Sequence, residues 1–321
     1  AAAIGLTGVP LFGNTFSVPG PEIGCQSEPV IPTISLGPHS ISRLIVGSNP
    51  ISGYSYLGNH TDRQMKDYFT TENTVEFLLK CEKAGINTHQ GSARMEYLKP
   101  LRERGSGIKF INLSSDRLKI KEIINTASPI AIVHHGGVTD RLFSEGNSMI
   151  VHDYVKAVKD TGLLAGVSAH NPDVIKEIAD QGWDVDFFMT CFYYLTRKEN
   201  MKEGTPTLPT GSYLFYKNDP AVMTKVIRQV RQPCLAFKIL GAGRLCSSQE
   251  VVKAAFRYAF ENIKPIDGVI VGMFPWFFDE IYANSQYTRE LGKSAEQIHK
   301  DIDREERRVG KECRSRWSLK I

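Results

Sequence analysis

The sequence predicts an α/β protein of the (β/α)8 TIM-barrel class, with a hairpin before the barrel and one inserted loop. Apolar strand patterns and amphipathic helix patterns alternate eight times along the chain, which favours parallel strands joined by right-handed helical crossovers. The 321 residues exceed the roughly 250 that one such barrel needs. An open doubly wound sheet would require a GxGxxG turn after an early strand, and none follows residues 44–46 or 86–88.

The predicted elements begin with a hairpin. Residues 34–47 hold two extended apolar segments around the turn Gly37-Pro38, so we expect a short hairpin that runs into the first buried strand. Further strands are expected over residues 86–90, 108–113, 130–135, 163–168, 185–192, 234–240 and 268–273. Acidic first turns and glycine stops predict helices over residues 72–84, 94–104, 116–126, 148–160, 172–180, 220–230, 249–262 and 277–291.

A single barrel domain is expected to span residues 31–292, with an inserted loop near 196–219 that is rich in Pro, Gly, Thr and Lys. Residues 1–30 are expected to be a leader or disordered. Their small, apolar opening is like the central region of an export signal, which favours an exported or periplasmic protein over a cytoplasmic one. Residues 293–321 form a tail, and residues 305–318 resemble one translated frame of a sequencing adapter. We therefore interpret the tail from about residue 304 as foreign to the natural protein.

Charge and cysteine content exclude several classes of partner. Residues 304–321 carry the whole net charge of +4, so the rest of the chain is neutral and a nucleic-acid partner is not expected. Beyond the opening, no apolar run approaches the roughly 18 to 20 residues of a membrane span. The cysteines before the tail include no CxxC pair, which implies neither a disulfide framework nor a zinc ribbon. A small-molecule substrate is the expected partner, and the oligomeric state is left open.

In a barrel of this class the chemistry lies at the carboxyl ends of the strands. The polar or sulfur-bearing residues expected there are Asn49, His89, Gln90, Ser114, Asp116, His134, His135, Ser168, His170, Asn171, Thr190, Cys191, Lys238 and Met273. Asn49, His170, Asn171 and the later Trp276 are expected to line the substrate pocket. Trp276 belongs to an aromatic segment, residues 274–278, that would give a ring-shaped substrate an apolar floor.

Two histidines and a lysine are the main catalytic candidates. His134 and His135 follow an apolar run, so one imidazole points into the barrel whichever the phase of the strand. The alternative for each is a hydrogen-bonded packing role. Lys238 is expected inside an apolar strand, where a charge is costly unless it is paired or deprotonated. Three roles for Lys238 stay open: one partner of an ion pair that closes the barrel, a catalytic amine, or a side chain that binds an anion.

A metal site is not expected. Gln90, His134, His170 and Cys191 offer amide, imidazole and thiol ligands on neighbouring strand ends. Few carboxylates join them, and hydrogen-bonded histidines explain the same residues. Cys191 fits a small buried side chain equally well.

Several short motifs, in this order and spacing, resemble the aldo-keto reductases, a family of eight-stranded barrels that bind a nicotinamide cofactor and reduce carbonyls. The similarity covers about residues 32–291. It is carried by Leu36-Gly37 and residues 42–47 in the hairpin, Gly85-Ile-Asn87, Gly166-Val-Ser168, Leu240-Gly-Ala-Gly-Arg-Leu245, and Gly272 followed by Glu280 and Asn284. The resemblance implies that NAD(P) binds at Ser168, Leu240, Gly241, Gly243 and Gly272.

The resemblance also implies a catalytic set of Asp, Tyr, Lys and His, in which the Tyr donates a proton. His134 matches the family's His, with His135 as the alternative. Gln90 stands at the Asp position, and the Tyr position falls near Met95, with Tyr97 two residues later. The Lys position holds Ser114 or Ser115.

The cofactor motif also departs from the family. Ala169 replaces the Asn that follows Gly-Val-Ser, and Met189 or Thr190 replaces the sixth-strand Gln. No basic residue lies between Lys264 and Arg289 to hold an adenosine phosphate. We therefore expect any nicotinamide binding to be weak and not to favour the 2′-phosphate.

Three functions stay open. The first, by resemblance, is a nicotinamide-dependent carbonyl oxidoreductase, for which the available proton donors are Tyr54, Tyr56 and Tyr97. The second is a cofactor-free or metal-assisted lyase, isomerase or hydrolase on a carbohydrate-like substrate. Its candidate residues are His134 or His135, His170, Gln90 and Lys238. The third is a non-catalytic barrel that binds a small ligand.

Overall fold

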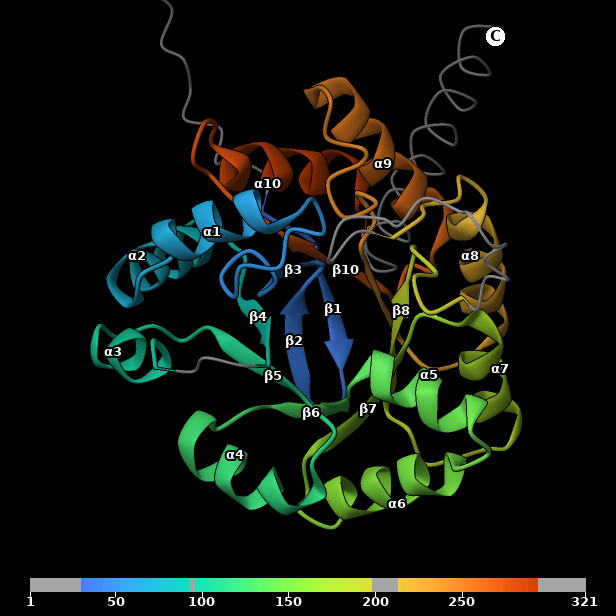
Figure 1. Ribbon diagram of the computed structural model, residues 1–321. Coiled ribbons are helices and arrows are strands. Elements are labelled where there is room, and N and C mark those ends of the chain that lie inside the picture. Colours follow the sequence, from blue (N-terminus) through green and yellow to red (C-terminus); the bar gives the residue numbers. More distant parts are fainter. Residues whose placement is uncertain (1–29, 93–95, 198–212, 294–321) are drawn as a thin grey trace, which may run out of the picture.

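The predicted (β/α)8 class is confirmed. The structure is a computed structural model that describes residues 30–92, 96–197 and 213–293, and within them a closed barrel of eight parallel strands is accompanied by an antiparallel hairpin (Figure 1). The barrel order is β10-β3-β4-β5-β6-β7-β8-β9, so strands that follow one another in the chain are paired and β10 closes the ring on β3.

The strands and helices have the following bounds. The hairpin consists of β1 (Thr33–Leu36) and β2 (His39–Ser42). The barrel strands are β3 (Leu44–Gly47), β4 (Thr88–Gly91), β5 (Lys109–Ser114), β6 (Ala131–His134), β7 (Leu164–Ala169), β8 (Phe187–Cys191), β9 (Cys234–Phe237) and β10 (Gly268–Gly272). The helices are α1 (Asn59–Tyr68), α2 (Thr71–Lys83), α3 (Leu98–Glu103), the 3-10 turn η1 (Arg117–Lys119), α4 (Ile120–Ala127), α5 (Gly136–Ser144), α6 (Ser148–Lys159), α7 (Pro172–Asp180), α8 (Asp219–Gln229), α9 (Gln249–Asn262) and α10 (Glu280–Leu291).

Two helices, α1 and α5, have no counterpart in the sequence-based prediction. Helix α1 buries a single side chain, Met65, so it lacks the apolar stripe by which helices are predicted. Helix α5 opens with Gly136 and Gly137, and glycine is a poor helix former. Helix α10 begins later than expected, at Glu280, because the Asp279 side chain accepts a hydrogen bond from the Tyr282 N–H and caps the first turn.

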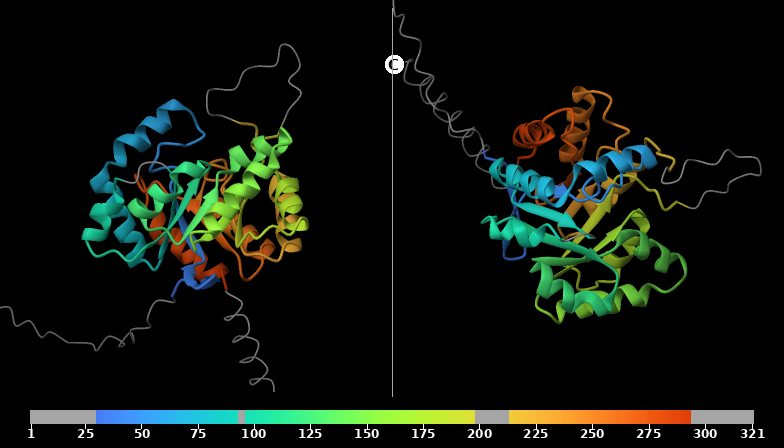
Figure 2. Two further views of the ribbon diagram at one scale, coloured as in Figure 1. Left: turned by 90° about the horizontal axis from the view of Figure 1, so that it is seen from below. Right: turned by 60° about the vertical axis from the view of Figure 1, so that its left-hand side comes forward.

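The barrel interior is filled by apolar side chains. Ile45, Ile111, Val133, Met189, Leu235 and Ile270 form one buried cluster with Ile34, Leu36 and Ile41 of the hairpin. Figure 2 shows the hairpin at one end of the barrel and α1 at the opposite end. The hairpin therefore closes the amino-terminal end, which leaves the carboxyl ends of the strands as the open mouth. The alternate strand residues pack outward against the helices in a second cluster.

Strand β9 is shorter than predicted, and this moves a candidate residue. The strand ends at Phe237, and Lys238 follows with a φ of 58°, in the left-handed region that an extended strand does not use. Gly241, Ala242 and Gly243 also have positive φ, so the chain turns sharply over the mouth of the barrel. Lys238 therefore begins a loop at the mouth and is not buried within a strand.

Several predicted segments lie outside the described residues: the leader up to residue 29, most of the inserted loop (198–212) and the tail from residue 294. Their predicted character stays a prediction. Within the described ranges, no helix is long and apolar enough to cross a membrane.

Candidate functional site

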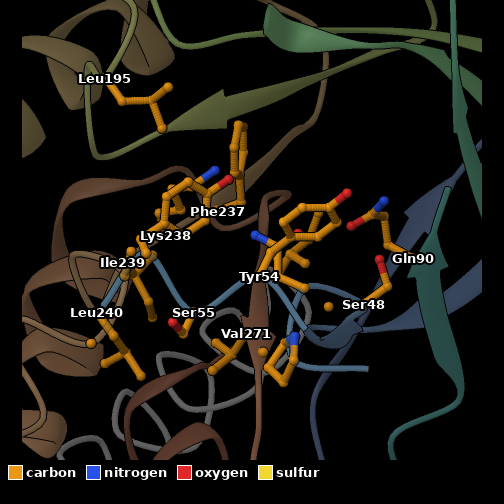
Figure 3. Close-up of a pocket in the computed structure, with 18 of the residues that line it drawn as sticks. Ser48, Tyr54, Ser55, Gln90, Leu195, Phe237, Lys238, Ile239, Leu240 and Val271 are labelled. Carbon is orange, nitrogen blue, oxygen red and sulfur yellow. The ribbon is translucent and has the colours of Figure 1, made fainter. Parts of the chain in front are cut away.

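A cavity of about 740 Å³ opens at the carboxyl ends of the barrel strands. Leu113, Met189, Phe237 and Ile270 from the barrel interior contribute its apolar lining. In Figure 3, Gln90 from β4 and Lys238 from the loop after β9 project into it from opposite sides. Other polar side chains at this mouth are Ser48, Asn49, His135, Ser168, His170 and Thr196. The cavity thus combines an apolar base with a polar wall, as small-molecule sites do.

Another part of the lining, which we call the second arm of the cavity, comes from the loop after β9, the first turn of α9 and the start of α10. This arm includes Leu240, Ala242, Gly243, Cys246, Gln249, Val252, Gly272, Phe274, Glu280 and Asn284. One carboxylate oxygen of Glu280, Oε2, accepts a 2.7 Å hydrogen bond from the Phe274 N–H. Burial raises the pKa of this carboxyl group. Of the residues predicted for a cofactor, Ser168, Leu240, Gly243 and Gly272 line the cavity. Gly241 does not appear among the described lining residues.

His134 does not line the cavity. Val133 belongs to the inner cluster, so the next residue of β6 points outward. There the Nδ1–H of His134 donates to Thr139 Oγ1 at 2.7 Å, and the ring lies edge-on to Tyr154. Burial, and then the neighbouring His135, lower the pKa of His134 to about 4. His135, one residue later, is the histidine of this pair that faces the mouth. The strand phase expected from the resemblance is therefore shifted by one residue.

Tyr97 also lies away from the cavity. Its hydroxyl is 2.7 Å from His89 Nε2, and His89 Nδ1 is 3.1 Å from the carbonyl oxygen of Val46. Both rings are buried outside the barrel, since Gln90 is the β4 residue that points into the mouth. Burial raises the pKa of Tyr97 above its usual range. This geometry makes Tyr97 a packing residue that holds β4 against α3.

Three other predicted residues have structural roles at the edge of the site. Asn171 caps α7, its Oδ1 accepting from the Asp173 N–H. Trp276 is 56% exposed and reaches the cavity only through Phe274, against which it stacks. Cys191 is buried with its Sγ 2.9 Å from the carbonyl oxygen of Tyr193, and burial raises its thiol pKa to about 12. A thiol in that state is a poor nucleophile and a poor metal ligand.

No sequence pattern pointed to Asp140, which lies behind His170 in the structure. The Asp140 carboxylate accepts the Nδ1–H of His170 at 3.0 Å, the backbone N–H groups of His170 and Asn171, and the Thr196 hydroxyl at 2.7 Å. A carboxylate can only accept hydrogen bonds, so His170 carries its proton on Nδ1 and its Nε2 is the unprotonated nitrogen. The signal for Asp140 is its position one helical turn after Gly136, on the face of α5 that packs against β7.

His170 is neutral at pH 7. Burial lowers its pKa to about 4, opposed by the hydrogen bond and charge of Asp140 and assisted by the charge of Lys238. The ring packs edge-on against Phe237 and lines the cavity. A neutral imidazole with an oriented Nε2 in a cavity wall is suited to accept a proton.

Lys238 lies between two aromatic rings. Its Nζ is 4.7 Å from the centre of the Phe237 ring and 4.9 Å from that of Tyr56. No carboxylate of the described chain lies within ion-pair distance of it, so the predicted ion pair that closes the barrel is not formed by the described residues. Aromatic faces attract an ammonium ion, so the two rings help to position the Lys238 side chain. Loss of solvent and then the charge of Lys238 lower the pKa of His135.

The four residues considered as metal ligands in the sequence do not converge on one point. His134 faces outward and the Cys191 thiol is bonded to a backbone carbonyl, which leaves Gln90 and His170. Among the residues that the structure describes, no group of three or more His, Cys, Asp or Glu side chains could hold a metal ion.

Comparison with protein-family models and with curated protein sequences finds no match. Solved structures match in fold. The aldo-keto reductase AKR11C1 from Bacillus halodurans, in its holo form, has a TM-score of 0.53 at 14% identity, over 83% of this chain and 94% of that one. The glycerol dehydrogenase AKR11B4 from Gluconobacter oxydans has a TM-score of 0.50 at 10% identity, over 84% and 94%.

Barrels of other activities match as well. A truncated 3-deoxy-D-arabino-heptulosonate 7-phosphate synthase from Thermotoga maritima has a TM-score of 0.47 at 12% identity, over 83% of this chain and 92% of that one. At such identities the likeness shows the fold alone, so function has to be argued from the site.

Proposed function

We propose that this chain is an enzyme that removes a proton from a small hydroxyl- or carbonyl-bearing substrate, with His170 as the base. The observation that carries the proposal is the Asp140–His170 pair in the wall of the cavity, with Nδ1 bonded to the carboxylate at 3.0 Å and Nε2 without a hydrogen-bond partner among the described residues. A histidine oriented in this way by a carboxylate recurs in general acid–base catalysis.

The residues around the pair define what happens to the proton. His170 Nε2 takes it from a substrate O–H or from a C–H next to a carbonyl, and the Asp140 carboxylate stabilises the imidazolium that results. The buried Gln90 amide, on the other side of the mouth, is placed to orient a substrate oxygen. The same imidazolium can return the proton to another atom of the substrate, which is what an isomerase or a lyase requires.

The test compares His170→Asn with His60→Asn, a control on the exposed face of α1. A panel of sugars, sugar acids and hydroxy acids is incubated with the protein in deuterated water, and NMR spectroscopy follows C–H exchange and conversion. We expect one chemical class to react with the wild type, about a hundredfold or more slowly with His170→Asn and unchanged with His60→Asn. Equal rates for His170→Asn and the wild type would remove His170 from the mechanism.

A second candidate, a nicotinamide-dependent oxidoreductase, is favoured by the second arm of the cavity. The lining of this arm includes Leu240, Gly243, Gln249 and Asn284, and its polar side chains fit a ribose or an adenine amine. The absence of any Lys or Arg between residues 264 and 289 does not fit a 2′-phosphate, so NAD suits the arm better than NADP. A bound nicotinamide would accept or supply a hydride, and His170 would exchange the proton of the substrate hydroxyl.

A titration of tryptophan fluorescence separates the two candidates. Trp276 stacks on Phe274 at the edge of this arm, so a dinucleotide bound there is expected to quench it. For the oxidoreductase we expect quenching by NADH at least as strong as by NADPH. Absence of quenching by both would leave the cofactor-free reaction, and tight binding that depends on the 2′-phosphate would contradict our interpretation of the arm.

A further inference from the structure

The first turn of α5 points unpaired backbone donors at the site. His135 provides the carbonyl that accepts from the Thr139 N–H, so the N–H groups of Gly136, Gly137 and Val138 precede the first hydrogen bond of the helix. Gly137 lines the cavity. Free N–H groups and the helix dipole make such a turn attractive to a negative charge.

Ser168 is an independent sign of a ligand at this turn. It is 2% exposed, lines the same cavity, and its hydroxyl has no hydrogen-bond partner among the described residues. Its Oγ is aimed at the start of α5, since it lies 2.8 Å from the point that a Cβ on Gly136 would occupy. A hydroxyl in the wall of a cavity that has no partner in the described part of the protein is free to bond a ligand there.

The charge at this end of the cavity is positive. Lys238 lines it, and its charge lowers the pKa of both His135 and His170, which line the same cavity as Ser168. The Asp140 carboxylate is already shared among His170, Asn171 and Thr196. Glu280, the one carboxylate among the described lining residues, belongs to the other arm and accepts from the Phe274 N–H. A single ammonium with neutral donors around it balances a group of one negative charge.

We propose that the first turn of α5, Ser168 and Lys238 form an anion subsite that binds a carboxylate, and that the substrate of His170 is a hydroxy acid such as a sugar acid. The second half of this statement rests on the proposed function, while the subsite rests on the geometry alone. Lys238 is then the anchor of the substrate carboxylate. His170 Nε2 meets the neighbouring hydroxyl or C–H group, where the bound carboxylate orients it.

The subsite is tested by calorimetric binding of D-gluconate, with D-glucose as the neutral analogue and glucose 6-phosphate as the phosphorylated one. We expect the wild type to bind gluconate at least tenfold more tightly than glucose. Lys238→Met should abolish this preference and Ser168→Ala should reduce it. Lys238→Arg should keep it, because a guanidinium also holds a carboxylate. The matched control is Lys225→Met, on the exposed face of α8, which should leave it unchanged.

Equal affinity for gluconate and glucose, no gluconate binding, or loss of the preference in Lys225→Met would overturn the subsite. Tenfold tighter binding of glucose 6-phosphate than of gluconate would overturn the choice of a carboxylate. His170→Asn separates this result from the proposed function: it should bind gluconate within about threefold of the wild type while losing turnover. If His170→Asn keeps turnover, the proposed function fails, and the gluconate measurements still decide the subsite.

Discussion

At the scale of single residues, the site depends on which of two neighbours faces inward. A strand alternates its side chains, so an error of one residue exchanges the inner and outer faces. His134 and His135 are indistinguishable in sequence, and Val133 at the inner face of β6 decides between them. Asp140 is not marked by any motif, because its role depends on α5 lying against β7. His170 and Lys238 could be predicted near the mouth because each follows an apolar run, and Gln90 because it ends the strand expected over residues 86–90.

The pH dependence of turnover follows from the pKa of His170. A base acts in its neutral form, and burial lowers the pKa of His170 to about 4, so the neutral form predominates down to about pH 5. We expect kcat/KM to change less than twofold between pH 7.5 and 5.5. A histidine with the ordinary pKa of about 6.5 would lose close to tenfold over the same range. Rates are measured at each pH, and circular dichroism verifies that the protein is still folded there. A tenfold loss of kcat/KM would show that His170 is not buried as described.

At the scale of elements, local pattern predicts the barrel well and its active-site helix poorly. Each predicted strand has a counterpart, and for most of them the reason is that buried parallel strands are apolar runs between turn signals; β4, with the sequence Thr-His-Gln-Gly, is the exception. Helix α5 is not predicted because it opens with two glycines, of which Gly136 is required by Ser168 and His170, residues distant in sequence. The start of the loop after β9 is not predicted either, because the pattern of apolar residues continues to Leu240 although the strand ends at Phe237.

The two glycines of α5 give a matched pair of substitutions. A Cβ on Gly136 would lie 2.8 Å from Ser168 Oγ and 3.2 Å from His170 Cε1, whereas a Cβ on Gly137 would meet only His135, at 3.5 Å. Gly136→Ala must therefore displace Ser168 or His170, at a cost of about 1 to 3 kcal/mol in the free energy of unfolding. Gly137→Ala is expected to be neutral or slightly stabilising.

Thermal unfolding and turnover measure this difference together. We expect Gly136→Ala to lower the turnover at least tenfold, because a shift of His170 also moves its Nε2 relative to the substrate. Gly137→Ala should stay within about threefold of the wild type in turnover. Equal behaviour of the two variants would show that the first turn of α5 does not press against the catalytic histidine.

At the scale of the whole molecule, three histidines are held neutral in its interior. Burial lowers the pKa values of His89, His134 and His170 to about 4. His89 and His134 lie on the outer faces of β4 and β6 and are hydrogen-bonded there to Tyr97 and Thr139, whereas His170 lies in the cavity wall. In the unfolded chain these three histidines bind protons near pH 6.5, whereas in the folded chain they bind them only near pH 4. Folding is therefore opposed by protons throughout this interval.

The free energy of unfolding is accordingly expected to be constant above about pH 7 and to fall as the pH decreases from 6.5 toward 4. Three protons give a slope that approaches about 4 kcal/mol per pH unit in the middle of the interval, which is enough to unfold a domain of ordinary stability before pH 4. Burial raises the pKa values of Asp267 and Glu280. The folded chain therefore binds protons at these two carboxyls more readily than the unfolded chain does, so they increase the stability as the pH falls, opposite to the histidines. The slope between pH 6.5 and 5, taken from urea unfolding curves, is therefore the quantity that reports the histidines.

His89→Gln should lower that slope by about a third whatever its own effect on stability, because one titrating group has gone and the slope counts protons. The exposed control His60→Asn should leave the slope unchanged. A wild-type stability that stays constant from pH 7 to 5 would mean that the three imidazoles are not held neutral by the fold.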